Sequence, residues 1–100
     1  MTLSLLEKSI EKVKDSVLKA SPENYKIFLF GSRADGSARL DSDIDVGFWG
    51  TKQFPREIFS KIKDELEESI VPYKVDLIDF YDKDASFKQT ALKKIVPWKN

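Results

Sequence analysis

GSRADGSARLDSDIDV, residues 31–46, joins two apolar runs of the chain. This stretch opens on a turn of small residues, Gly31-Ser32, and closes on the acid–apolar–acid triplet Asp43-Ile44-Asp45. If the second apolar run is a β-strand, the two acids point to the same face, because side chains alternate along a strand. Their Cα atoms would lie about 6.5 Å apart, at about 3.3 Å rise per residue. Two carboxylates held this close repel each other unless a cation lies between them, so the pattern predicts a metal site.

The length and charge of the chain limit the classes of function. A chain of 100 residues predicts a single domain, residues 1–100, which is large enough to bury its own core. The 41% apolar and 12% aromatic content favours a folded chain. Seventeen basic residues balance 17 acidic ones, so the net charge attracts neither nucleic acid nor an anionic membrane surface. We therefore expect no direct binding of nucleic acid and none of membranes.

Two residue types are absent, and their absence decides the available chemistry. Without cysteine there is no disulfide and no zinc–thiolate site, and without histidine there is no imidazole base or ligand. Acid–base and metal chemistry must fall to carboxylates, which prefer hard cations such as Mg²⁺ or Mn²⁺. Residues 1–9 lack the pattern of a signal peptide, and no apolar run approaches the roughly 20 residues that span a bilayer. A cytoplasmic location is expected.

Hydrophobic periodicity, together with capping and helix-breaking residues, predicts the elements of an α+β fold. We expect helices over residues 4–20, 55–70 and from 84 or 86 to 95, a single turn over 32–37, and strands over 25–30, 43–49 and 75–80. Ser4 with Glu7 fits a capping box, and Pro55 suits the first turn of the second helix. The buried stripe of that helix is predicted to contain Ile58, Phe59, Ile62, Leu66 and Ile70. The order αβαβαβα, counting the turn as a helix, predicts a small mixed sheet with helices packed mainly on one face.

Alternation along the strands predicts which acids face the site. Asp43, Asp45, Gly47 and Trp49 share one face of the second strand. In the third strand Asp76 and Asp79 face opposite sides, because Asp79 alternates with Val75 and Leu77. Trp98 lies in a polar tail beyond the last helix, where its ring needs cover from the core or from another chain. Lysines 88, 93, 94 and 99 are interpreted as a solvated helix face, with an acidic partner as the alternative.

Three better-known motifs share fragments of the opening stretch, and each fails at a definite residue. Ser37-Ala38 occupies the Lys-Ser/Thr position of a Walker A loop. An EF-hand loop beginning at Asp41 would require glycine where Val46 stands and glutamate where Lys52 stands. The Gly-x-Gly-x-x-Gly fingerprint of a Rossmann fold is absent.

Gly31-Ser32 followed by Asp43-Ile44-Asp45 resembles the Gly-Ser…Asp-x-Asp pattern of the DNA polymerase β-like nucleotidyltransferase superfamily. Asp76 in the next strand matches the third acid of that superfamily, so the resemblance spans residues 25–80. Within the superfamily, the chain is most similar to the minimal nucleotidyltransferases (MNT), which occur as antitoxin partners of HEPN-domain toxins. One residue departs from the pattern: Asp35 stands where many minimal members carry a basic residue.

The resemblance implies a nucleotidyltransferase fold and a role for each residue of the motif. Gly31, Ser32 and Arg33 would contact the phosphates of ATP or of another nucleoside triphosphate. Asp43, Asp45 and Asp76 would be the catalytic residues and would bind two Mg²⁺ ions, or Mn²⁺ in their place. The implied reaction transfers NMP, AMP from ATP by preference, to a hydroxyl of a partner protein. That partner would be a HEPN toxin held in a hetero-oligomer, with a homo-oligomer as the alternative.

Other readings of the same residues stay open at this point. Taken alone, Asp41-Ser42-Asp43 is typical of a solvated turn, and Asp45 would then be a polar residue on an exposed face. In a second class of function, the chain neutralises a HEPN partner by docking without chemistry, a reading that Asp35 favours. A third interpretation, transfer to a small molecule such as an antibiotic, has less support, because no added acidic segment is present to receive a polycationic aminoglycoside.

Overall fold

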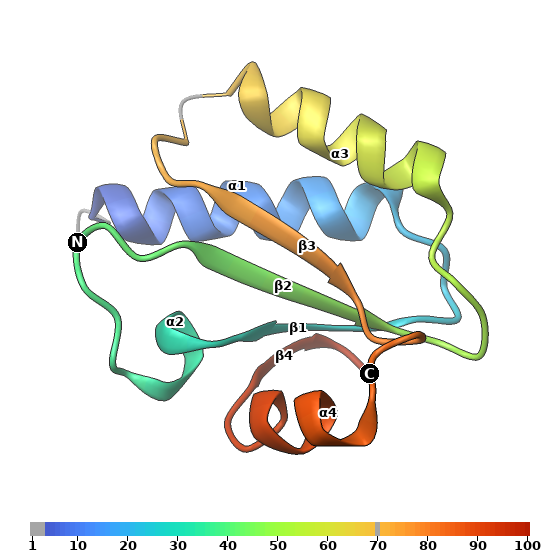
Figure 1. Cartoon of the computed structure of the whole chain (residues 1–100). Coiled ribbons are helices and arrows are strands. Elements are labelled where there is room, and N and C mark those ends of the chain that lie inside the picture. The colour runs from blue at the N-terminus through green and yellow to red at the C-terminus, as the bar shows by residue number, and fades with distance from the viewer. Residues whose placement is uncertain (1–3, 70) are drawn as a thin grey trace.

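The computed structural model describes residues 4–69 and 71–100, which form four helices and four strands around one mixed sheet (Figure 1). In chain order the elements are α1 (Leu5–Ala20), β1 (Lys26–Phe30), α2 (Ser32–Asp35), β2 (Ile44–Trp49), α3 (Arg56–Glu67), β3 (Val75–Asp79), α4 (Ala85–Ala91) and β4 (Val96–Lys99). The strand order across the sheet is β3-β2-β1-β4. β2 and β3 run parallel, whereas β1 is antiparallel to both of its neighbours. The predicted α+β class is confirmed.

The central strand β1 is covered on both faces, as its nearly continuous apolar run predicts. The four residues after Lys26 are all buried. Ile27 and Leu29 face one core, whereas Phe28 and Phe30 face the other. A strand that contributes to two cores fixes the position of the turn that follows it.

The two long helices cover one face of the sheet together (Figure 1). α1 begins with the predicted capping box, in which Ser4 and Glu7 each accept a backbone N–H hydrogen bond from the other. Fully buried side chains from α1 and α3 pack with β1 and β2, among them Val13, Val17 and Ile62. Within residues 4–69 and 71–100, no helix is long and apolar enough to cross a membrane.

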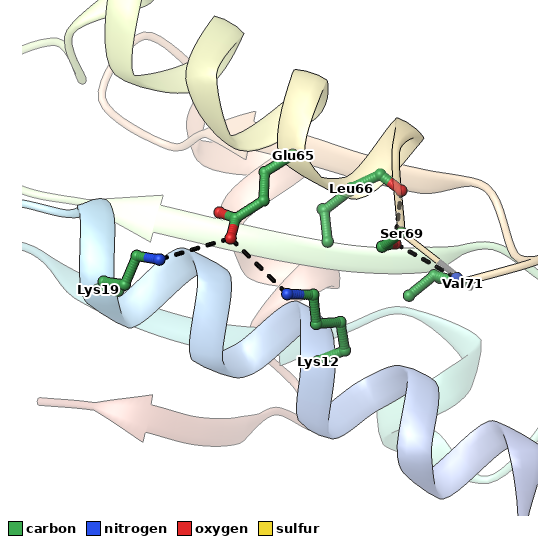
Figure 2. A network of polar contacts seen from close by, with 6 residues as sticks. All are labelled: Lys12, Lys19, Glu65, Leu66, Ser69 and Val71. Atoms are coloured by element: carbon green, nitrogen blue, oxygen red, sulfur yellow. Dashed lines mark hydrogen bonds and ion pairs between the residues drawn. The ribbon is translucent and has the colours of Figure 1, made fainter.

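α3 is shorter than predicted, and polar contacts bind its end to the rest of the layer (Figure 2). Pro55 precedes the helix as its N-cap residue instead of lying in its first turn, and Ile70 lies outside the described residues. Glu65 Oε1 forms ion pairs with two lysines of α1, with Lys12 Nζ at 3.7 Å and Lys19 Nζ at 3.5 Å. Such exposed pairs contribute about 0–1 kcal/mol, so apolar burial dominates the packing of α1 on α3.

The helix ends at Glu67, and the side chain of Ser69 then hydrogen-bonds to the nearby backbone. The Ser69 hydroxyl donates to the Leu66 carbonyl at 2.6 Å and accepts from the Val71 backbone N–H at 3.3 Å, as Figure 2 shows. A serine hydroxyl that bonds to nearby backbone competes with the helical hydrogen bonds, which accounts for the early end of the helix.

α4 lies on the opposite face of the sheet from α1 and α3 (Figure 1). There Phe28, Phe30 and Phe80 form a second core, with Phe80 fully buried and its ring centroid 5.0 Å from that of Phe28. Ala91 and Leu92 pack against this cluster. The helices are therefore mainly, but not all, on one face.

The predicted last helix ends too late, and a fourth strand was missed. α4 stops at Ala91, and β4 pairs with β1 where a polar tail was expected. Pro97 hides this strand in the sequence, but an edge strand tolerates proline because one side of its backbone needs no partner. Trp98 is half-buried against the α1–α3 core, so its cover comes from this chain.

Candidate active site

The parallel pairing of β2 with β3 brings the three predicted acids together. Asp45 lies directly beside Asp76 in the register, and Asp43 immediately precedes β2. The Ile44 backbone N–H donates to the Lys74 carbonyl at 2.9 Å, which continues the pairing to the start of the strands. One carboxylate oxygen from each acid lies within 4.8 Å of the others, and all three residues are half-buried.

The electrostatics of this acidic trio, Asp43, Asp45 and Asp76, favour a bound cation. Burial, and next the charges of Asp76 and Asp43, raise the pKa of Asp45 above its usual range, while Lys74 opposes that shift. Three oxygen donors at this spacing suit a hard divalent cation, which would relieve the repulsion that raises the pKa. The residues therefore fit the metal that the sequence pattern predicts.

Lys74 supplies the positive charge nearest to the trio, a role that the sequence analysis missed. Its Nζ lies 3.9 Å from Asp43 Oδ2 and 3.8 Å from Asp76 Oδ1. The side chain is 72% exposed, so these long contacts are weak and are exchanged at little cost in free energy. Its position two residues before Asp76 was the available signal, because residues two apart share a face of an extended chain.

Gly31 places the backbone of the small-residue turn against the trio. It follows β1, whose last residue pairs with Asp45. A Cβ at Gly31 would lie 2.5 Å from Asp45 Oδ2, and the residue has φ +72°, a conformation that favours glycine. Ser32 then begins the single turn α2, as predicted. The predicted phosphate-binding turn and the predicted metal ligands are therefore adjacent.

The side chain of Arg33, in α2, is held by the loop that follows this helix. Its Nη2 donates to the Ser42 carbonyl at 2.8 Å and to the Leu40 carbonyl at 3.3 Å, and the guanidinium lies 5.2 Å from the centroid of the Tyr73 ring. These contacts hold the segment that leads to Asp43. The predicted contact of Arg33 with nucleotide phosphates would require an exchange of these hydrogen bonds.

Asp35, the residue that departs from the family pattern, is engaged with its own turn. Its Oδ1 accepts hydrogen bonds from the Ser37 hydroxyl at 2.6 Å and from the Ser37 backbone N–H at 2.9 Å. These bonds lower the pKa of Asp35, and the charge of Lys94 adds to the effect. The carboxylate is therefore held by the loop that follows α2.

Asp79 has a structural role, on the face of β3 opposite to Asp76, as alternation predicts. Its Oδ2 accepts from the Phe54 backbone N–H at 2.8 Å, and its Oδ1 accepts from that of Tyr81 at 3.0 Å. This carboxylate joins the end of β3 to the segment that precedes α3.

Comparison with known proteins places these features in a family. Residues 11–97 match the profile of the family described as "Polymerase beta, Nucleotidyltransferase". A relative from Haemophilus influenzae, named "Probable protein adenylyltransferase MntA", is 27% identical over 78 residues, which are 78% of this chain and 68% of the relative.

Solved structures share the fold. A toxin–antitoxin crystal structure with AMP-PNP contains a chain that superposes with a TM-score of 0.64 at 24% identity, over 92% of this chain and 71% of that one. A complex of a tri-AMPylated HEPN toxin of Shewanella oneidensis with its MNT antitoxin gives 0.65 at 20% identity, over 92% and 70%. These similarities confirm the predicted nucleotidyltransferase fold.

Proposed function

Because the chain belongs to the polymerase β nucleotidyltransferase family, we propose that it transfers AMP from ATP to a hydroxyl of a HEPN toxin, for which it is the antitoxin. The observation that carries this proposal is the meeting of Asp43, Asp45 and Asp76 beside the Gly31-Ser32 turn. The name of the Haemophilus relative and the AMPylated toxin in the Shewanella complex support the choice of AMP and of acceptor. An ATP substrate also implies a cytoplasmic site of action.

Each residue of the site has a part in this proposal. The acidic trio binds two Mg²⁺ ions, or Mn²⁺ in their place, and the Gly31 backbone and the Ser32 hydroxyl hold the phosphates of ATP. When bound, the ions would lower the pKa of the acceptor hydroxyl and neutralise the charge of the leaving pyrophosphate. Arg33 is proposed as a further phosphate contact, once it exchanges its bonds to the loop. Lys74 is exposed enough to leave the trio when cations enter.

The transfer itself is a single displacement. The acceptor oxygen forms a bond to the α-phosphorus while the bond from that phosphorus to the bridging oxygen breaks. Pyrophosphate departs with the electron pair of the broken bond. The Asp76 carboxylate accepts the hydroxyl proton and passes it to water. Asp76 suits this part because its strand, β3, is at the edge of the sheet, where a second protein can approach.

The decisive experiment follows label from ATP to the toxin. The chain is incubated with Mg²⁺, ATP labelled at the α-phosphate and the HEPN protein encoded beside it. We expect labelled toxin, and a loss of at least about a hundred-fold in Asp43→Asn, because a metal ion contributes several kcal/mol to such a transition state. Asp41→Asn is the matched control, since Asp41 is an exposed acid of the same loop outside the trio.

Neutralisation in cells separates catalysis from docking. We expect the double variant Asp43→Asn/Asp45→Asn to bind the toxin yet fail to protect cells from it. Full protection by this variant would overturn the enzymatic proposal and would show that docking alone neutralises the partner. Unlabelled toxin in the first experiment would overturn it as well.

A further inference from the structure

Lys74 combines a fixed backbone with an exposed side chain. Its carbonyl accepts the Ile44 backbone N–H at 2.9 Å, a bond that belongs to the pairing of β2 with β3. Its side chain is 72% exposed and lies next to β3, which is at the edge of the sheet (Figure 1). The side chain can therefore change its ionic contacts while the backbone keeps the two strands paired.

The ammonium of Lys74 bridges two carboxylates of the acidic trio and acts on the third. Nζ lies 3.9 Å from Asp43 Oδ2 and 3.8 Å from Asp76 Oδ1. Burial and the charges of these two acids raise the pKa of Asp45, and the charge of Lys74 opposes that rise. The three acids therefore share one counter-ion that the chain itself supplies.

A metal ion and this ammonium compete for the same oxygens. A divalent ion bound to Asp43 and Asp76 would lie within a few ångströms of Nζ and would repel it. A hollow of about 350 Å³ beside β3 gives the displaced side chain a place, because Lys74 is part of its lining. Glu67 lines the same hollow and offers a carboxylate there. Metal binding and the ion pairs of Lys74 therefore exclude each other.

The neighbouring cations have other positions. Among residues 4–69 and 71–100, Lys74 is the one cation within ion-pair distance of the trio. Arg33 donates to the Ser42 carbonyl, and its guanidinium lies near the Tyr73 ring. Lys63, on α3, lines the same hollow as Lys74 and so provides a matched comparison. Removal of the Lys74 charge should therefore change the electrostatics of the trio in a way that removal of the Lys63 charge does not.

We propose that Lys74 is an internal competitor of the metal ions, which neutralises part of the charge of the trio in their absence and sets the metal affinity of the site. This inference rests on the proposed metal-dependent transfer and adds a control on it. Because an incoming ion must displace the ammonium, metal alone binds weakly. An ion that enters with a triphosphate also gains the contacts of the phosphates with the Gly31-Ser32 turn, which offset the displacement. The site is therefore loaded by metal together with nucleotide.

Titration of the full chain with Mn²⁺ tests this inference without nucleotide or acceptor, with the free ion measured by electron paramagnetic resonance. Lys74→Met keeps the apolar stem and removes the charge, and we expect it to lower the Kd for Mn²⁺ about five-fold, the effect of losing weak ion pairs. Lys74→Arg keeps the charge and should leave the Kd within about two-fold of the parent value. Lys63→Met is the matched control and should leave the Kd unchanged.

Urea unfolding of the same variants gives a second measurement. In EDTA, Lys74→Met should be less stable than the parent, because the trio loses its counter-ion, and saturating Mn²⁺ should remove this difference. If Lys74→Met leaves the Kd unchanged or raises it, or if the difference in stability persists in saturating Mn²⁺, the ammonium stays beside the bound ion. The inference is then wrong, and nucleotidyl transfer stands.

Failure of the site itself gives a different result. If neither the parent nor any variant binds Mn²⁺, this inference and the proposed function are both wrong. Lys74→Gln also removes the charge and keeps the backbone bond to Ile44. It should show the same fall in Kd if Lys74→Met does not fold.

Discussion

Two glycines at the ends of one short turn share a conformation but differ in their surroundings. Gly31 and Gly36 both have positive φ, yet a Cβ at Gly31 would meet the Asp45 carboxylate, whereas nothing lies within 4 Å of one at Gly36. We expect Gly36→Ala to lower the free energy of unfolding by about 1–2 kcal/mol, which is the cost of a left-handed backbone conformation for alanine. No steric clash adds to this cost. Gly31→Ala should cost more and also abolish binding of Mg²⁺ and nucleotide, because it displaces Asp45.

Urea unfolding of both variants, with nucleotide titration of each, checks this pair. Equal losses of stability, or unchanged nucleotide binding in Gly31→Ala, would contradict the close approach of the turn to Asp45.

Protonation of Asp45 should make the folded protein more stable on acidification, which is unusual for a carboxylate. Burial, followed by the charges of Asp76 and Asp43, raises its pKa in the folded protein above the ordinary value of 3.8. The folded state therefore takes up this proton at a higher pH than the unfolded chain does, so acidification through the raised pKa adds stability, and the gain is complete below 3.8. In EDTA, Asp45→Asn should be more stable than the parent near pH 7, and the difference should narrow toward about pH 4.

Urea denaturation at a series of pH values measures that difference. A gap between Asp45→Asn and the parent that widens on acidification would mean that the pKa of Asp45 is lowered in the folded state.

Asp76 and Asp79 lie on the same strand, and we expect the first to act in transfer and the second to stabilise the fold. Asp79→Ala removes the acceptor of two backbone N–H groups, one of them that of the buried residue Phe54. It should lower the free energy of unfolding by about 1–3 kcal/mol and leave nucleotide binding intact. Asp76→Asn should abolish transfer and lose no stability, because it removes a charge from a repelling trio. Thermal melting and the transfer assay of both variants check this assignment. A loss of transfer in Asp79→Ala together with a loss of stability in Asp76→Asn would contradict it.

At the scale of elements, local patterns predicted most of the fold. The capping box of α1, the buried alternation of β2 and the turn α2 depend on residues near one another in sequence, and the structure confirms them. β4 and the end of α4 depend on β1, which lies far away in the chain. β4 has only four residues and contains Pro97, which lacks a backbone N–H, so its short alternation of Val96 and Trp98 was too weak to predict a strand.

The site divides in the same way. Alternation and the Gly-Ser…Asp-x-Asp pattern identified the acidic trio, which the register of β2 and β3 brings together. Lys74 was missed although its spacing to Asp76 was a local signal, because its contact with Asp43 depends on the pairing of β2 with β3. Arg33 shows the same limit, because its hydrogen bonds to a neighbouring loop could not be read from the motif.

β4 should contribute to stability through Trp98. We expect Trp98→Ala to lower the free energy of unfolding by about 2 kcal/mol, below the 3–5 kcal/mol typical of a fully buried aromatic residue, because the ring is only half-buried. Val96→Ala, on the same strand at a residue that is 43% exposed, should change it little. Guanidinium unfolding of both variants measures the contrast. A negligible effect of Trp98→Ala would mean that its ring does not pack on the α1–α3 core.

For the whole molecule, binding and stability should be linked. A ligand that binds only the folded state stabilises it by about 2.7 kcal/mol at a free concentration 100 times its Kd. We expect Mg²⁺ with ATP to raise the melting temperature of the chain by several degrees, and ATP with EDTA to do so much less. Asp43→Asn/Asp45→Asn should lose the shift. A melting curve indifferent to Mg²⁺ and ATP at millimolar concentration would contradict the site.

The parallel pairing of β2 with β3 has a consequence for how the site forms during protein synthesis. Asp45 and Asp76 are neighbours in the sheet, but a complete crossover through α3 separates them along the chain. A chain still emerging from the ribosome has its glycine–serine bend and two of its acids before the third exists, so it cannot assemble the trio. Newly made molecules would therefore acquire their chemistry in one step, when the crossover closes, rather than gradually as the first two acids emerge.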